Sequence, residues 1–341
     1  MLDRHPVPVP PEGKSGAGRQ VVAPAEDRGA VGAAGREAGG FPASVCANLR
    51  SRVLTGGPML DKRIAFIGSG AMAEAMIAGL LRHELEKPEH LLAAGPRSER
   101  GEQLRRRYGV RPFTDNSEAA AQADVAVLSV KPQRLSQVLR GLKGVRPDAL
   151  VLSIVAGAPI AKIQTALRHP AVVRSMPNTP AQIGEGITVW TVSSAVTAEQ
   201  RTTARTILGA LGDEVFVEDE DYLDMATALS GTGPTYVFLF MEALIDAGVH
   251  MGFPRRIAER LVLETIKGSV AYYEKSQSHP AALRNQVTSP GGTSAEALYY
   301  FEKAGFRTAI SRAVWAAYQR SLELGKETPG HIPEAHPSEG A

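Results

Sequence analysis

Between about residues 63 and 217, short apolar runs alternate with stretches in which apolar positions recur every three or four residues. The runs predict strands, and the periodic stretches predict amphipathic helices. We expect strands at 64–67, 90–94, 124–130 and 149–155, and helices at 72–81 and 99–108. The last two strands consist mostly of consecutive apolar residues, which is typical of strands covered on both faces. This alternation predicts an α/β fold with a doubly wound parallel sheet.

From about residue 220 onward, strand-like runs give way to long stretches with a helical period. We expect helices at 222–229, 234–251, 254–275 and 295–324. Pro234 and Pro254 stand at first-turn positions, and Gly252 and Gly305 mark helix ends. The chain is therefore divided into a sheet domain at 59–220, an all-helical domain at 221–326 and a frayed tail at 327–341.

The first 58 residues form a separate segment, in which 17 residues are proline or glycine. Such a composition is typical of disordered chains, because little apolar surface is available to offset the entropy of ordering. Two interpretations remain open: a disordered extension, or a start site placed too early, with the protein beginning at Met59.

Composition and charge narrow the class of protein. Hydrophobic residues make up 43% of the chain and charged residues 22%, with a net charge of +2, so neither a nucleic-acid nor a membrane partner is indicated. No uninterrupted apolar run approaches the roughly 18 residues of a membrane-spanning helix. The single cysteine, Cys46, cannot form an internal disulfide, which favours a cytoplasmic location. The eight histidines show no metal-binding spacing, so no metal is expected.

The first predicted strand leads directly into a glycine-rich turn, Gly68-Ser69-Gly70-Ala71-Met72-Ala73. This is a G-x-G-x-x-A fingerprint between a strand and a helix, the context of a Rossmann-type dinucleotide site. Gly68 permits the tight turn, and Gly70 lets the backbone approach a pyrophosphate at the helix N-terminus. The alternative is a tight turn that needs glycine for its backbone angles alone.

The residues after the second strand indicate which dinucleotide binds. Sites for NAD usually place a carboxylate there, whereas this chain has Gly95-Pro96-Arg97-Ser98. Arg97 offers a planar donor fork suited to a 2′-phosphate, with Ser98 as a second donor. We expect NADPH, with NADH as the alternative cofactor; a solvated Arg97 is the competing interpretation.

The stretch 287–296 predicts a second ligand site. Thr293 and Glu296 have the spacing of a capping box at the start of a helix. Two glycines precede that helix, and hydroxyl residues flank them. Free amides at such a turn suit a carboxylate, and Ser289 and Ser294 can hydrogen-bond other polar atoms of a small zwitterion.

Five motifs together resemble the pyrroline-5-carboxylate reductase family, whose members catalyse the last step of proline biosynthesis. They lie at 66–72, 130–133, 176–180, 229–234 and 289–293, within a resemblance that spans residues 61–326. The family implies hydride transfer from NAD(P)H to the C=N carbon of 1-pyrroline-5-carboxylate, which yields L-proline. It also implies a C-terminal helical domain that forms dimers or larger homo-oligomers.

The resemblance also implies roles for individual residues. For the cofactor these are Gly68, Ser69, Gly70, Ala71, Met72, Gly95, Arg97, Asn116, Val130, Lys131 and Ala156. For the substrate they are Glu220, Ser289, Gly292, Thr293 and Ser294. Ser294 takes the place of the hydroxyl that bonds the ring nitrogen, and it is the expected catalytic residue.

Two residues depart from the family pattern. The family commonly has threonine where this chain has Ser294, which keeps the hydroxyl but loses the methyl that restricts its rotamer. Gln286 stands where some members have asparagine. Lys131 precedes Pro132, and we interpret it as part of a turn that lines the nicotinamide rather than as a proton donor.

Two other functions remain as alternatives. One is a β-hydroxyacid dehydrogenase, which requires a catalytic lysine on the helical domain, with Lys267 as the candidate. The other is a redox sensor that binds NADP(H) without turnover.

Overall fold

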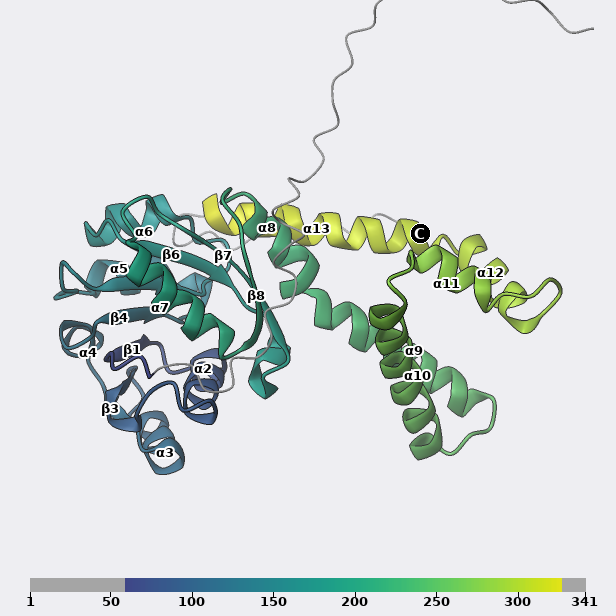
Figure 1. Ribbon diagram of the computed structural model, residues 1–341, viewed down its shortest axis with the longest axis horizontal. Coiled ribbons are helices and arrows are strands. Elements are labelled where there is room, and N and C mark those ends of the chain that lie inside the picture. The colour runs from purple at the N-terminus through teal and green to yellow at the C-terminus, as the bar shows by residue number, and fades with distance from the viewer. Residues whose placement is uncertain (1–58, 327–341) are drawn as a thin grey trace, which may run out of the picture. The chain divides into compact units, whose positions relative to one another are not determined.

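A computed structural model describes residues 59–326, and its eight strands form a single sheet (Figure 1). The strand order is β3-β2-β1-β4-β5-β6-β7-β8. The strands are β1 (Ile64–Ile67), β2 (Leu91–Ala94), β3 (Arg111–Phe113), β4 (Val125–Leu128), β5 (Leu150–Ser153), β6 (Val172–Met176), β7 (Gly186–Val192) and β8 (Gly212–Phe216). The first six are parallel in the order of a dinucleotide-binding sheet. Strand β7 runs antiparallel to β6, and β8 runs parallel to β7.

Helices cover both faces of the sheet. After β8, all regular elements within the described residues are helices. Those of the sheet half (residues 59–220) are α2 (Ala71–Arg82), α3 (Ser98–Tyr108), α4 (Asn116–Ala121), α5 (Pro132–Gly141), α6 (Ile160–Leu167) and α7 (Ala198–Gly209), with 3₁₀ turns at Pro88–His90 and Thr179–Ile183. Those of the helical half (residues 221–326) are α8 (Tyr222–Ala226), a π-helical turn (Thr227–Gly231), α9 (Gly233–His250), α10 (Arg255–Ser276), α11 (Pro280–Gln286), α12 (Thr293–Lys303) and α13 (Phe306–Lys326).

Alternate residues of each central strand enter two different cores. Ile64 and Phe66 pack in one cluster, with side chains from α2, α3 and α7. Ala65 and Ile67 pack in the other, with side chains from α4, α5 and α6. Because successive strand residues point to opposite faces, a strand buried on both sides is apolar along most of its length. The doubly wound α/β fold expected from the sequence is confirmed.

The observed elements differ from the predicted ones mainly at their ends. Strand β4 stops at Leu128, and Ser129 and Val130 leave the ladder. The helix expected at 295–324 is two helices, because Gly305 adopts a left-handed φ of 69° between α12 and α13. Several elements were not predicted individually: helix α11, helices α4 to α7, and strands β3, β6, β7 and β8. Pro254 is the N-cap of α10 rather than a first-turn residue.

Between the two halves, the last strand ends at Phe216 and α8 begins at Tyr222. The domain boundary at residue 220 remains a prediction. Both interpretations of residues 1–58, and the tail at 327–341, lie outside the described residues.

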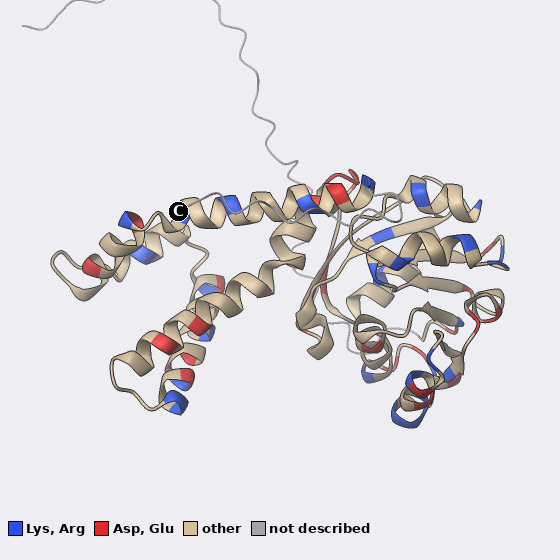
Figure 2. Cartoon of the chain, turned by 180° about the vertical axis from the view of Figure 1, so that it is seen from behind, with Lys and Arg blue, Asp and Glu red and all other residues tan. Residues whose placement is uncertain are grey.

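The helices of the helical half expose large apolar side chains in the single chain. Phe238, Leu239 and Trp315 are each 60% exposed or more. Figure 2 shows long uncharged stretches on α9, whereas charged residues recur along α13. One stretch, Tyr222–His250, is long and apolar enough to cross a membrane by length and composition alone, although polar residues interrupt it throughout. It also carries Glu242 and Asp246, and it spans α8, the π-helical turn and α9 rather than one helix.

Candidate functional site

A cavity of about 1020 Å³ lies at the carboxyl ends of the parallel strands. Gly68, Gly95, Ser129 and Ile154, which directly follow β1, β2, β4 and β5, all line it, as does Met176 at the end of β6. In a doubly wound sheet, ligands bind where the strand order reverses, here between β1 and β4. The cavity occupies that position.

The glycine turn after β1 leaves room for a phosphate. Gly68 has a φ of 101°, and a Cβ added there would lie 2.6 Å from Cγ1 of Val130. A Cβ on Gly70, in contrast, meets nothing within 4 Å, so this residue borders open space. The first amides of α2 have no intrahelical acceptor, and Ala71 and Met72 line the cavity. The turn therefore fits a pyrophosphate, as the fingerprint predicts.

The far end of the cavity has groups suited to a phosphorylated ribose. Arg97 lines the cavity, is exposed, and its guanidinium forms no hydrogen bond or ion pair within residues 59–326. Asn116 also lines the cavity, and its Oδ1 is buried without a partner among the described residues. Asp115 is the nearby carboxylate, but it caps α4 by accepting a bond from the Ser117 amide at 2.7 Å. These residues fit NADP-type dinucleotides.

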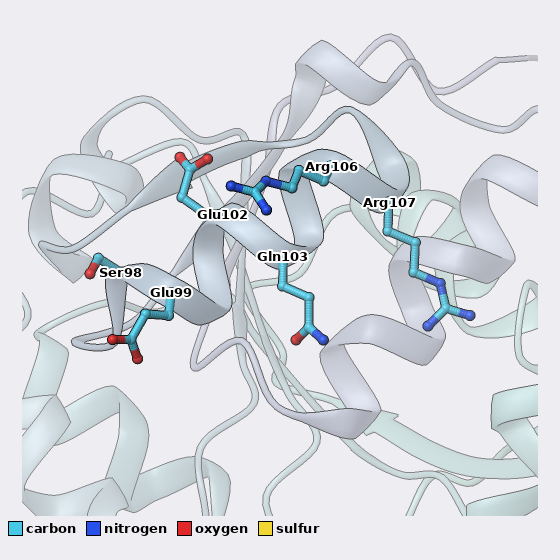
Figure 3. Close-up of a pocket in the computed structure, with 6 residues that line it drawn as sticks. All are labelled: Ser98, Glu99, Glu102, Gln103, Arg106 and Arg107. Carbon is cyan, nitrogen blue, oxygen red and sulfur yellow. The ribbon is translucent and has the colours of Figure 1, made fainter.

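Ser98 lies elsewhere. It lines a separate cavity of about 540 Å³ along α3, together with residues of that helix as far as Arg107 (Figure 3). As the first residue of α3, it is carried past the rim of the dinucleotide cavity. Its expected role as a second donor remains a prediction that this placement does not support.

The remaining cofactor residues expected from the sequence line the opposite end of the cavity. Val130, Lys131 and Ala156 lie there. Lys131 is the N-cap of α5 with extended backbone, and Pro132 begins that helix. The Lys131-Pro132 pair therefore starts a helix rather than ending a strand, and the interpretation of Lys131 as a turn residue remains a prediction.

Several lining residues were not singled out from the sequence. The Ser129 hydroxyl donates to the Gly68 carbonyl at 2.8 Å and so braces the glycine turn. Gly231, in the π-helical turn, approaches Met176 so closely that an added Cβ would lie 2.5 Å from its Cε. Asn178 lines the cavity while its Oδ1 accepts from the Ile187 amide. Two motifs of the family resemblance, at 176–180 and 229–234, contain three of these four residues and were the available signal.

Glu220 belongs to a partly buried ionic cluster beside the cavity. Its Oε1 accepts bonds from the Ile160 amide at 2.8 Å and from the Arg174 guanidinium at 2.9 Å. Arg174, only 4% exposed, also pairs with Asp224 at 3.0 Å. Asp224 in turn accepts a 2.6 Å bond from the Ser321 hydroxyl. The cluster joins β6, the start of α6, α8 and α13, and its charges are paired, as burial requires.

The last helix also packs against a wall of the cavity. Gly157 follows Ala156 and has a φ of 64°. A Cβ there would lie 2.8 Å from Cβ of Leu324 and 3.0 Å from the Ser321 carbonyl. The C-terminal end of α13 therefore lies directly behind the loop that carries Ala156.

The loop before α12 differs from its predicted form. The N-cap is Gly292, which makes no side-chain capping bond, and Thr293 is the first helical residue. The predicted capping box is wrong because the helix begins one residue early, which moves Glu296 from the third helical position to the fourth. Gly291, with a φ of 69°, and Gly292 form a turn closed by the Gly292 amide on the Ser289 carbonyl at 3.0 Å.

The expected cofactor and substrate residues are not brought into one cavity within a single chain. None of Glu220, Ser289, Gly292, Thr293 and Ser294 lines the dinucleotide cavity, whereas all the expected cofactor residues except Ser98 do. Within residues 59–326 there is also no cluster of three or more potential metal ligands.

Comparison with known proteins identifies relatives along nearly all of the described chain. Residues 220–324 match the family model for pyrroline-5-carboxylate reductase dimerisation, and residues 63–157 match that for NADP oxidoreductase, coenzyme F420-dependent. A pyrroline-5-carboxylate reductase of Synechocystis is 43% identical over 265 residues, covering 78% of this chain and 99% of the relative. That of Pseudomonas aeruginosa is 40% identical, covering 79% and 99%.

Solved structures agree with these relatives. The pyrroline carboxylate reductase of Plasmodium falciparum, determined with NADP bound, superposes with a TM-score of 0.73 at 34% identity, covering 78% of this chain and 99% of that one. With sequence relatives of this identity over their full length, and with the dinucleotide cavity and the helical half described above, the chain belongs to the pyrroline-5-carboxylate reductase family.

Proposed function

We propose that this protein reduces 1-pyrroline-5-carboxylate to L-proline, the last step of proline biosynthesis, with NADPH as hydride donor and NADH as the alternative. The observation that carries the proposal is the relation to full-length reductases in a chain that also has a dinucleotide cavity at the switch point of its sheet. A cytoplasmic location is part of the same proposal and rests on the lone cysteine.

The cofactor supplies the hydride when bound, and the residues of the cavity hold it. The turn at Gly68–Met72 takes the pyrophosphate on the first amides of α2. Arg97 takes the 2′-phosphate through its guanidinium fork. Asn116, the first residue of α4 and part of the cavity lining, meets the adenosine ribose. Val130, Lys131 and Ala156 line the nicotinamide end.

The Ser289–Ser294 segment holds the substrate. The amides of Thr293 and Ser294, at the start of α12, suit its carboxylate, since the helix dipole favours an anion there. Ser294 hydrogen-bonds the ring nitrogen. An alcohol is a poor acid at neutral pH, so Ser294 acts by positioning the C=N bond and by electrostatics. The proton on nitrogen comes with the substrate or through water.

The active form is a homo-oligomer in which the site is completed between subunits. The family match at 220–324 is a dimerisation model, and the helical half exposes large apolar side chains that a second copy would cover. Because Ser289–Ser294 do not line the cavity of their own chain, we propose that a partner subunit brings them to it.

Turnover is the direct test of the reaction. Purified protein should consume NADPH only when 1-pyrroline-5-carboxylate is present, with L-proline formed in equal amount. NADPH bound without consumption would favour the redox sensor. Consumption with a β-hydroxyacid and NADP⁺ would favour the dehydrogenase, although Lys267, its candidate lysine, lies on α10 and does not line the cavity.

A variant of Ser294 distinguishes an effect on the chemical step from an effect on cofactor binding. Ser294→Ala should lower kcat about 100-fold or more, because a positioned polar contact to the reacting group is lost, while the Kd for NADPH changes less than about twofold. Ser294→Thr restores the family residue and should retain most of the activity. An equal loss in turnover and in NADPH binding would contradict the assignment.

A composite site can be tested by complementation. Gly70→Phe fills open space in the cavity and should abolish cofactor binding, and Ser294→Ala lacks the substrate hydroxyl. Co-expression of the two inactive chains should yield heterodimers with one intact site, so mixed protein should recover about a quarter of wild-type activity. Sites confined to one chain would give no recovery.

A further inference from the structure

Arg100 lies behind the glycine turn and bonds to it from outside the cavity. It stands on α3, and its Nε donates to the carbonyl oxygen of Ser69 at 3.1 Å. Ser69 is the middle residue of the Gly68-Ser69-Gly70 turn, and both glycines line the cavity, whereas Arg100 does not. Arg100 therefore touches the backbone that would hold the pyrophosphate without facing the pyrophosphate itself.

The other guanidinium nitrogens of Arg100 are also occupied. One pairs with Glu74 on α2, and the other donates to Gln103 at 2.6 Å. Glu74 is bound further by Arg107 at 3.0 Å and by the Tyr108 hydroxyl at 3.0 Å. Arg100 and Glu74 are each about four-fifths buried. This network, formed by Arg100, Glu74, Arg107 and Tyr108, joins α3 to the first turn of α2.

The network removes two groups that would oppose an anion at the turn. A carbonyl oxygen turned toward the cavity would repel phosphate, and the Ser69 carbonyl is held away from it by Arg100. A carboxylate in the first turn of α2 would also repel phosphate, and Glu74 is neutralised by two guanidinium groups. Burial raises the pKa of Glu74, but hydrogen bonds from Arg100 and Tyr108 lower it below its usual value, so the pair is ionised at neutral pH.

Arg97, three residues earlier, differs from Arg100 in its position relative to the cavity and in the bonding of its guanidinium group. It lines the cavity, and its guanidinium has no protein partner within residues 59–326. A guanidinium that is free and faces the ligand can select a 2′-phosphate, whereas one whose three nitrogens are engaged cannot do so without breaking those bonds.

We propose that Arg100, anchored by Glu74, is a positioning residue for the phosphate-binding turn and supports NADPH and NADH alike, while Arg97 alone discriminates between them. The inference rests on the proposed dinucleotide binding and adds a residue whose effect does not depend on the 2′-phosphate. It predicts that the two arginines have separable effects on affinity.

The test measures Kd for both cofactors by equilibrium binding, without turnover. Arg100→Gln should raise both Kd values by the same factor, about tenfold, as expected for loss of a charge-assisted bond. Arg97→Gln should raise the Kd for NADPH and leave that for NADH unchanged. Arg105→Gln is the matched control, since Arg105 is also on α3 and, within residues 59–326, forms an ion pair with Glu102 alone; it should change neither value.

A second readout uses the protein without cofactor. Hydrogen exchange at the amides of residues 69–73 should be faster in Arg100→Gln than in Arg105→Gln, because the turn has lost its brace. In Arg100→Gln, the added change Glu74→Gln should recover part of the affinity for both cofactors, because it removes a carboxylate that has lost one of its two guanidinium partners. If Arg100→Gln does not fold, Arg100→Lys should show smaller losses, again equal for the two cofactors.

Distinct outcomes overturn the inference. Unchanged Kd values in Arg100→Gln would show that the network serves stability alone. A loss confined to NADPH would make Arg100 a direct phosphate ligand. Failure of the wild-type protein to bind either cofactor is a separate result, and it would overturn the proposed function instead.

Discussion

The inner strands of the sheet half and the long helices of the helical half are both rich in apolar residues, yet they differ in what covers them. In each of the strands β1, β2, β4 and β5, all four residues are buried within the chain. In contrast, α10 buries only Ala258, and α12 buries no residue. The sheet half supplies its own core on both faces, whereas the helical half depends on a second copy.

This difference shows that the periodic spacing of apolar residues identifies the face of a strand or helix that becomes buried. It does not identify the surface that buries that face. In the sheet half, the covering helices are the next elements along the chain. In the helical half, the same kind of pattern faces outward, and length and hydropathy alone do not distinguish α8–α9 from a membrane span. The family match to a dimerisation model resolves that ambiguity.

The largest expected effect comes from a core residue that needs no partner. Phe66→Ala, at a fully buried position of β1, should lower the free energy of unfolding by about 3–5 kcal/mol. Urea unfolding should give the same loss at every protein concentration. The matched change Phe238→Ala, on exposed α9, should act only where oligomers form, so its effect should vary with concentration. Equal, concentration-independent losses would abolish the distinction between the halves.

A charge on the helical half should break the oligomer. Leu239→Arg, at a position 65% exposed in the single chain, would bury an unpaired charge on association. The oligomer dissociation constant should rise by at least about 100-fold, as measured by light scattering across a dilution series. Ile183→Arg, at a 71% exposed apolar site on the sheet half, is the control and should leave the oligomeric state unchanged. NADPH binding should survive Leu239→Arg if the cofactor cavity belongs to one chain.

The next largest effect should come from changes in the ionic cluster formed by Arg174, Glu220 and Asp224. Asp224→Asn removes one of two carboxylates that face the buried Arg174. It should lower the free energy of unfolding by about 2–3 kcal/mol, measured by urea unfolding. Ser321→Ala removes one hydrogen bond to Asp224 and should lower it by about 1 kcal/mol. If Asp224→Asn costs less than Ser321→Ala, the ionic part of the cluster contributes nothing.

The smallest effect concerns pH. Although burial raises the pKa of Glu74, bonds from Arg100 and Tyr108 lower it overall. Its contribution to stability is therefore present above the unfolded pKa of about 4.3 and is lost as the pH falls through the lower folded value. Glu74→Gln should flatten the loss of thermal stability as the pH falls below about 4.3. An unchanged slope would show that the network does not stabilise the fold.

Sequence reasoning succeeded where local geometry decides the structure. Gly68 must adopt a positive φ beside Val130, and the fingerprint captures that requirement within six residues. Sequence reasoning failed where the role of a side chain depends on a partner that is distant in the chain. Arg97 and Arg100 look alike in the sequence, but only Arg100 meets Glu74, 26 residues away in the chain.

Two threonines illustrate the same limit at helix starts. Thr197 and Gln200 form a true capping box at α7, while Thr293 and Glu296, with equivalent spacing, do not. The glycine turn before Thr293 already closes on Ser289, so α12 starts one residue early. Spacing identifies a possible cap, and the preceding turn decides whether it forms.

The contact between α13 and the loop at Gly157 has a consequence for the order of synthesis. Ser321 reaches Asp224 across 97 residues, and Leu324 backs the loop that carries Ala156. A ribosome releases the sheet half long before either residue exists, and domains fold as they emerge. Until then, one wall of the cavity has no helix behind it, and Asp224 lacks its hydrogen bond from Ser321. The wall is complete only after α13 has been translated, so the cofactor site reaches its final form late in synthesis.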